Sequence, residues 1–169
     1  MTHIDNTPEG LRALLARDHR ELESLFQELM SALRADARDD VLRLWTAFDE
    51  GLCRHMALEE KEILPLLQRQ DEREVKELSK EHDEIRKQLA ELGVGVDLHE
   101  IPVQTVQGFI QRLREHARRE DSLAYRWAEV NVPAAEQLKL GANLGAASAL
   151  RQRLLGLGRK VKSRVAASR

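Results

Sequence analysis

The sequence has a single cysteine, Cys53, and aromatic residues make up only 4% of its 169 residues. One cysteine cannot form a disulfide within the chain, so we expect a protein of a reducing compartment. The first ten residues lack the basic segment and the apolar segment of a secretory signal. No uncharged stretch approaches the roughly 20 apolar residues that a membrane helix requires. Together these absences predict a cytoplasmic protein.

The residues that are abundant favour helices. Apolar residues make up 42% of the chain and charged residues 33%, and there are only four prolines. A mixture rich in Leu, Ala, Glu and Arg is typical of long helices. No segment alternates apolar and polar residues in the manner of a strand. The sequence therefore predicts an all-α protein.

Apolar residues recur every three to four positions in four segments of the chain. The predicted helices run from Pro8 to about Leu33, from Val41 to about Leu67, from Asp71 to Leu92 and from Pro102 to Asn131, with a turn at 35–40 and a glycine-containing loop at 93–100. Pro65 is expected to kink or loosen the end of the second helix. Four such helices with short connections predict an up-down-up-down four-helix bundle.

The charge of the chain changes near Pro133. Residues 133–169 carry eight basic side chains and one acidic one, a net charge of +7, whereas residues 1–132 carry −9. We therefore predict a four-helix domain over 1–132, followed by a basic amphipathic, helical extension over 133–169. Three interpretations of the extension stay open: a fifth helix packed on the bundle, a segment that contacts an anionic partner, membrane surface or nucleic acid, or a mobile segment. The sequence gives no firm evidence for nucleic acid or a membrane, and it does not indicate the oligomeric state.

Four of the six histidines lie one per predicted bundle helix, each in phase with the apolar residues around it. These are His19, His55, His82 and His116. His55 and His116 each begin the pattern H-x-x-x-E, which ends at Glu59 and Glu120. Four residues span about 400° of α-helix, so each imidazole lies on the same face as its carboxylate. The two histidines of each half are separated by 36 and 34 residues, which indicates a two-helix unit used twice.

Four histidines and two glutamates that point into one bundle core need partners. A buried carboxylate without one is strongly destabilising. Divalent cations supply the missing charge, and carboxylates can bridge two cations. Two imidazoles for each metal leave coordination positions for a small molecule. The alternative is a metal-free bundle with polar residues in its core. This interpretation would have to explain all four histidines and both glutamates at their matched positions.

The spacing differs from the E-x-x-H pattern of ferritin-like di-iron proteins, because no acidic residue stands three positions before any of these histidines. The pattern instead resembles the hemerythrin-like, or HHE cation-binding, domain family. The motifs are DHRELE (18–23), HMALEEKEILP (55–65), EHDEIRKQL (81–89) and HARREDSLAYRWAE (116–129), and the resemblance covers about residues 8–131. It implies a hemerythrin-like bundle with a non-haem centre of two Fe ions, oxo- or hydroxo-bridged. The implied terminal ligands are His19, His55, His82 and His116, and the implied bridging ligands are Glu59 and Glu120.

Two positions depart from the oxygen-carrying members of that family. Leu78 stands where they have a fifth histidine, and they bridge with an aspartate at the spacing that Asp121 occupies here. Glu120 matches the other half of the repeat and is our choice, with Asp121 as the competitor. Glu60 is expected to be a surface charge, with a role as an additional ligand as the alternative. Nitrogen and oxygen ligands would also accept Zn or Mn, so iron rests on the resemblance.

Three further side chains near the motifs are expected to have other roles. Tyr125, roughly on the side of its helix opposite His116, and Trp127 are expected to pack in the core. Asp18 is expected at the surface, with orientation of a neighbouring ligand as the alternative.

The ligand set looks more like that of the bacterial stress-response and iron-centre-repair members than that of the oxygen carriers. We expect a protein that binds or reacts with O2, peroxide or nitric oxide, in the oxidative or nitrosative stress response or in iron handling. The sequence leaves open whether it is an enzyme and which residues would be catalytic. The alternatives are an iron- or oxygen-dependent sensor or interaction module that signals through the C-terminal extension, and a metal-free structural bundle.

Overall fold

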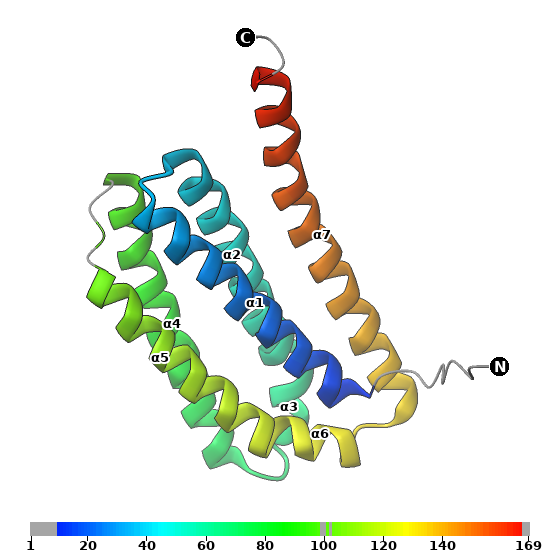
Figure 1. Ribbon diagram of the computed structural model, residues 1–169. Helices are drawn as coiled ribbons and strands as arrows, with labels where there is room; N and C mark the ends of the chain where they lie inside the picture. Colours follow the sequence, from blue (N-terminus) through cyan, green and yellow to red (C-terminus); the bar gives the residue numbers. More distant parts are fainter. Residues whose placement is uncertain (1–9, 99–100, 102, 167–169) are drawn as a thin grey trace, which may run out of the picture.

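The computed structural model describes residues 10–98, 101 and 103–166, and these are almost entirely helical (Figure 1). The elements in chain order are α1 (Leu11–Arg34), α2 (Arg38–Leu58), the π-helical η1 (Glu59–Ile63), α3 (Leu64–Leu67), α4 (Glu72–Leu98), α5 (Val103–Glu120), the π-helical η2 (Asp121–Tyr125), α6 (Arg126–Asn131) and α7 (Ala134–Ala166). No strand occurs among the described residues. The all-α prediction is confirmed. The predicted helix starts at Pro8 and Pro102 lie outside the described residues.

Four helical rods form the bundle, because α2, η1 and α3 are continuous, as are α5, η2 and α6. Neighbouring rods pack in chain order: α1 on α2, α2 on α4, and α4 on α5. The η2 and α6 segments close the bundle against α1. Successive rods run in opposite directions (Figure 1), which is the predicted up-down-up-down arrangement.

A layer of polar residues divides the apolar core of the bundle into two clusters. The first cluster includes Phe26, Phe48 and Phe109, whose ring centroids lie 5.2 to 6.5 Å apart. The second cluster includes Leu15 and Ile63. On each rod the motif histidines and glutamates lie at or next to the boundary between the two clusters. The polar layer therefore crosses the whole core.

The predicted loop at 93–100 is wrong over residues 93–98, which continue α4 to Leu98; residues 99–100 lie outside the described part. Tertiary packing outweighs the low helix propensity of the two glycines. Val96 is 1% exposed within the first cluster. The α-carbon of Gly93 passes close to the indole of Trp45, to which a β-carbon would lie 3.5 Å away. Burial of Val96 extends the helix where composition alone suggested a loop.

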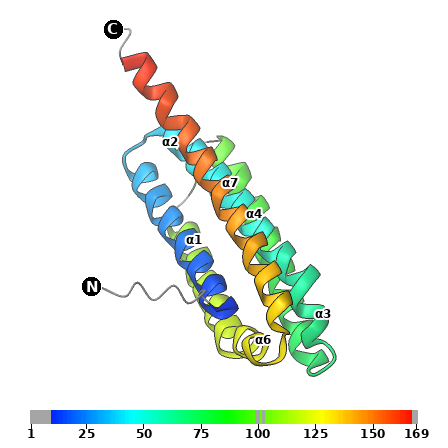
Figure 2. The same cartoon turned by 90° about the vertical axis from the view of Figure 1, so that its right-hand side faces the viewer.

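The segment after Pro133 forms α7, which packs against α1 and α2 and whose C-terminal part extends past the bundle (Figure 2). Its buried residues include Leu140, Leu144, Arg151 and Leu155. Leu140 and Leu144 join the second apolar cluster, and Leu155 joins the first. No helix among the described residues combines the length and apolarity needed to cross a membrane.

Candidate metal centre

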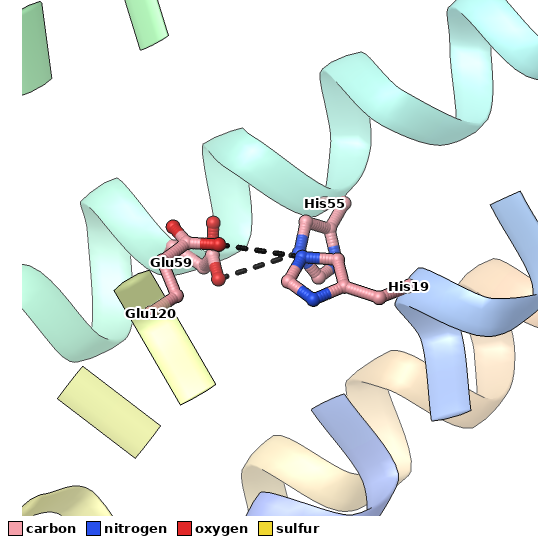
Figure 3. Close-up of side chains that lie close together, drawn as sticks. All are labelled: His19, His55, Glu59 and Glu120. Atoms are coloured by element: carbon pink, nitrogen blue, oxygen red, sulfur yellow. Dashed lines mark hydrogen bonds and ion pairs between the residues drawn. The ribbon is translucent and has the colours of Figure 1, made fainter. Parts of the chain in front are cut away.

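The six predicted ligand residues converge in the polar layer. They are His19 on α1, His55 on α2, Glu59 in η1, His82 on α4, and His116 and Glu120 on α5. All are buried except His19, which keeps 16% of its side chain exposed. They form two groups of four, one with His19 and His55 and the other with His82 and His116, and both groups contain Glu59 and Glu120. Within each group the candidate ligand atoms lie within 4.8 Å of one another. Figure 3 shows the first group, with both imidazoles directed at the two carboxylates.

Each glutamate presents one oxygen to each group. Glu120 Oε2 lies 3.3 Å from His19 Nε2, and Glu120 Oε1 lies 3.2 Å from His82 Nε2 and 3.0 Å from His116 Nε2. Glu59 Oε1 lies 3.3 Å from His55 Nε2, and Glu59 Oε2 lies 3.4 Å from His82 Nε2. All four histidines therefore direct Nε2 toward the two shared carboxylates.

A carboxylate holds the other ring nitrogen of three of these histidines, and an arginine holds each carboxylate. The three sets are His55–Asp18–Arg151, His82–Glu60–Arg86 and His116–Glu81–Arg119, with Nδ1-to-oxygen distances of 2.8, 2.9 and 2.7 Å. An Nδ1–H that donates to a carboxylate leaves the Nε2 lone pair free for a metal. His19 has no such partner for Nδ1 among the described residues, and it contacts its neighbours there through Nε2 and the face of the ring.

These sets settle the positions of two acids that the sequence left ambiguous. Asp18 is 4% exposed, so the expected surface position is wrong and the alternative, orientation of a neighbouring histidine, describes its contact with His55. Glu60 is partly exposed and belongs to neither group of candidate ligands. Its carboxylate instead spans His82 and Arg86. The sequence offered one signal for this layer, namely acidic residues beside or near each histidine.

Asp121, the competitor of Glu120, points away from the layer. Its carboxylate forms a two-fold ion pair with Arg12 of α1, at 2.9 and 3.1 Å, and keeps 40% of its side chain exposed. Glu120 is 1% exposed and lies in both groups. The geometry therefore favours Glu120.

Tyr125 is buried as predicted, but the predicted orientation of its side chain is wrong. Its hydroxyl reaches the layer, where it donates to Glu59 and lies 3.2 Å from Nε2 of both His19 and His55. In an α-helix Tyr125 would lie about 140° around the axis from Glu120. The π turn η2 makes i→i+5 hydrogen bonds and so brings residues five apart close to the same face.

The two π turns occupy equivalent places, immediately at or after the H-x-x-x-E glutamate of each half. For η1 the sequence contains a cause. Pro65 lacks an N–H and its ring clashes with the carbonyl four residues earlier, which disfavours regular α-helix there. No proline occupies the equivalent position two residues after η2, where the sequence has Trp127, and no other sequence signal marks this turn. The π turns are therefore the part of the site that sequence periodicity missed.

The charges of the polar layer stabilise one another without metal. Burial opposes protonation of His82, but hydrogen bonds to Glu120 and Glu59 raise its pKa to about 10. Burial opposes ionisation of Glu120, yet hydrogen bonds from the surrounding histidines hold its pKa well below its usual range. Burial and the charges of the two glutamates raise the pKa of Tyr125 well above its usual value, so its hydroxyl stays protonated. A metal ion must therefore displace protons in order to bind.

The residues present fit a transition-metal site. Two buried atoms of the second group, Glu59 Oε2 and His116 Nε2, have no partner with hydrogen-bond geometry. Buried polar atoms are seldom left in this state, and a cation would satisfy both. Imidazole nitrogens with carboxylate oxygens suit Fe, Zn or Mn better than the all-oxygen sites of Ca²⁺ and Mg²⁺.

A cavity of about 370 Å³ adjoins the layer between α1, α2 and α5. Three of the candidate ligands, His19, His55 and His116, are part of its lining. Its apolar lining is Leu22, Phe48, Leu52, Met56, Ile110, Leu113 and Ala117. An ion pair between Glu23 and Arg114, with Nε at 3.2 Å from the carboxylate, also lies on this cavity and joins α1 to α5. The cavity provides apolar space for a small molecule next to the histidines.

Comparison with protein-family models finds a match to the hemerythrin HHE cation binding domain over residues 11–128. Comparison with curated proteins and with solved structures gives no match. The matched residues run from the start of α1 into α6 and include all six converging side chains, whereas α7 lies beyond them. The match covers well over half of the chain, and the His/Glu groups are those of a cation-binding site. The chain is therefore a metal-binding protein that belongs to the hemerythrin HHE cation-binding domain family.

Proposed function

We propose that the chain is a non-haem di-iron protein that binds or reacts with a small oxidant, namely O2, peroxide or nitric oxide. One observation carries the proposal: two groups of candidate ligands share both carboxylates, Glu59 and Glu120. Each carboxylate directs one oxygen to each pair of histidines. This is the arrangement that a bridge between two ions requires, and a single-ion site would have no use for it.

In this proposal each ion is held by the Nε2 atoms of two histidines. His19 and His55 would hold one ion and His82 and His116 the other, and Glu59 and Glu120 would be shared by both. Leu78, which is fully buried in the second apolar cluster, supplies no ligand. With two histidines and two carboxylate oxygens for each ion, coordination positions stay open for a small molecule.

Iron is supported by the family match, and the donor set is compatible with it. Zn is its main competitor because intrinsic affinity favours Zn over Fe(II). When bound, iron supplies redox chemistry and open coordination positions for the oxidant. The chain supplies the surroundings. Apolar side chains of the cavity exclude water and admit a small uncharged molecule. Tyr125 keeps a protonated hydroxyl beside both carboxylates, where it can donate a hydrogen bond to a ligand.

Metal analysis of the purified protein tests the proposal. After anaerobic reconstitution with Fe(II) we expect two irons per chain, and we expect the His55→Ala, Glu59→Ala double variant to lose the site. A wild-type chain that binds no iron, or one iron only, would contradict the di-iron proposal. A chain that retains Zn in preference to Fe under these conditions would contradict the choice of metal.

Reactivity is tested separately on the iron-loaded protein. Peroxide or nitric oxide should be consumed, or bound with a change in the absorption spectrum, faster than by the double variant. Equal behaviour of the two proteins would count against a reaction with these oxidants. Consumption would place the protein among enzymes of the oxidative or nitrosative stress response, and binding without turnover would favour iron handling or sensing.

A second function is favoured by one contact. Arg151 of α7 donates to Asp18, and Asp18 contacts the candidate ligand His55. This indirect contact, through Asp18, supports the alternative of an iron- or oxygen-dependent sensor that signals through the extension. A sensor predicts that occupancy of the centre changes the state of α7, whereas an enzyme requires no such change.

A further inference from the structure

Arg151 is a buried cation that reaches the centre from outside the four-helix bundle. It lies on α7 and is 3% exposed. Its Nη2 donates to Asp18 Oδ1 and, at 2.8 Å, to Glu21 Oε2. The other oxygen of Asp18 lies 2.8 Å from His55 Nδ1. A continuous set of contacts therefore runs from α7 to one of the six candidate ligands.

The bundle leaves space for this side chain at Gly51. Gly51 lies on α2, one turn before His55. A β-carbon at residue 51 would lie 2.8 Å from Arg151 Cδ and 3.0 Å from a methyl carbon of Leu22. Any larger residue would have to displace one of these side chains. The glycine at residue 51 therefore provides the space that the side chain of Arg151 occupies.

The other two histidine–carboxylate–arginine sets are built within the bundle. Arg86 lies on α4, one turn after His82, and Arg119 lies on α5, three residues after His116. Both arginines belong to helices of the bundle itself, so separation of α7 would leave them in place. Arg151 differs, because separation of α7 would remove it and leave the four bundle rods in place.

We propose that Arg151 is a positioning residue through which docking of α7 and metal binding by His55 are thermodynamically linked. The inference rests on the proposed metal site. Asp18 can fix the ring of His55 only while its own carboxylate is held in place. Arg151 holds that carboxylate through Oδ1, and Oδ2 contacts His55. Loss of Arg151 frees Asp18 to rotate toward water, and His55 then loses its fixed orientation.

The linkage acts in both directions. If docking of α7 strengthens metal binding, then metal binding must strengthen docking of α7 by the same factor. Partners that support a ligand histidine in this way typically change metal affinity by about 10- to 100-fold. We expect a factor in this range for Arg151. A macromolecule that binds α7 and separates it from the bundle would therefore lower the metal affinity of the site.

The test uses the full chain and compares Arg151→Met with Arg86→Met, a matched control in which the arginine belongs to the bundle. Two quantities are measured for each protein: Fe(II) affinity, by anaerobic competition with a chromophoric chelator, and amide hydrogen exchange of residues 140–156 with and without Fe(II). Wild type should show slower exchange in α7 when iron is bound. Arg151→Met should lose this dependence and bind iron about 10- to 100-fold more weakly. Arg86→Met should also bind iron more weakly but keep the dependence of α7 exchange on iron.

Two further variants keep the test decisive if Arg151→Met folds poorly. Gly51→Ala should displace the guanidinium while retaining its charge, and should reproduce the loss of linkage. Arg151→Lys retains the charge and should restore part of the iron affinity. Wild-type iron affinity in either Arg151→Met or Gly51→Ala would overturn the linkage and leave Arg151 a structural residue. Unchanged α7 exchange in wild type with iron bound would also overturn it. A wild type that takes up no iron would instead refute the proposed function, and the linkage with it.

Discussion

The hydroxyl of Tyr125 donates a hydrogen bond to Glu59 across the bundle, from one π turn to the other. The same hydroxyl lies 3.3 Å from Glu120 Oε2. The only tyrosine of the chain therefore connects the two carboxylates that are common to both groups of candidate ligands. This contact exists because both halves of the repeat place a π turn at the glutamate.

Replacement of Tyr125 by Phe should destabilise the metal-free protein more than the metal-loaded one. The substitution leaves a buried Glu59 oxygen without its donor, which costs about 1–3 kcal/mol. A bound cation satisfies that carboxylate, so the loss should shrink on loading. Urea unfolding with chelator and with Fe(II) measures both values. Ser122→Ala removes an exposed hydroxyl from the same π turn and should change stability by less than about 0.5 kcal/mol. An equal loss in both states of Tyr125→Phe would contradict the assignment of Glu59 to the metal.

Glu120 and Asp121 offer a direct comparison between neighbours. Glu120→Gln should abolish or severely reduce metal binding, because it removes the charge shared by both groups. Asp121→Asn should retain full metal content, since its carboxylate pairs with Arg12 away from the layer. Metal analysis of the two variants, prepared and reconstituted in parallel, decides between them. The reverse result would assign the bridge to Asp121.

The metal-free protein should lose stability as the pH rises above about 6.5. The pKa of His82 is about 10 in the folded chain, against about 6.5 in an unfolded one. Below about pH 6.5 the imidazole is protonated in both states and its pairing contributes fully. That contribution declines as the pH rises through the folded pKa. Urea unfolding with chelator, at several pH values between about 6 and 9, follows the change.

Metal binding should show the opposite dependence, because the histidines bind as neutral imidazoles and a cation must displace their protons. Fe(II) affinity should therefore rise over the same pH range in which the metal-free chain becomes less stable. A metal-free chain whose free energy of unfolding stays level or increases with pH would show that His82 is not charged in the folded state.

A larger side chain in the cavity should slow the entry of small ligands. Leu113 lines the cavity beside the histidines and is partly buried. Leu113→Trp should lower the association rate of nitric oxide with the iron-loaded protein several-fold, with metal content unchanged. Leu123→Trp makes the same change on the exposed side of η2, where Leu123 is 47% exposed. Stopped-flow absorption compares the two variants, and similar rates in both would indicate another route to the centre.

The fold could be predicted because its signals are local. Spacing of apolar residues located every bundle rod, and the repeated H-x-x-x-E pattern located the side chains that meet in the core. The end of α4 was predicted wrongly because glycines suggest a loop, whereas contacts of Val96 and Gly93 with distant residues determine the helix. Propensity is a weak guide where such packing opposes it.

The surroundings of the candidate ligands were less predictable. The orientation of Tyr125 depends on the π turn η2, in which it is the last residue. No residue type in the sequence marks this turn. The partners of the histidines come from other helices or from neighbouring turns, so their roles follow from how the rods meet. Arg151 is the extreme case, since it lies 133 residues from the Asp18 it contacts. A sequence alone gives little indication of a partner at that separation.

The polar layer that crosses the core has a consequence for the chain before it is loaded. Without its ions the bundle has a polar layer across its middle. The two apolar clusters are joined there mainly by paired charges instead of packed apolar side chains. Opening at such a weak point exposes backbone to proteases long before global unfolding. We therefore expect the lifetime of the chain in a cell to follow the supply of its metal, so that empty molecules are degraded first.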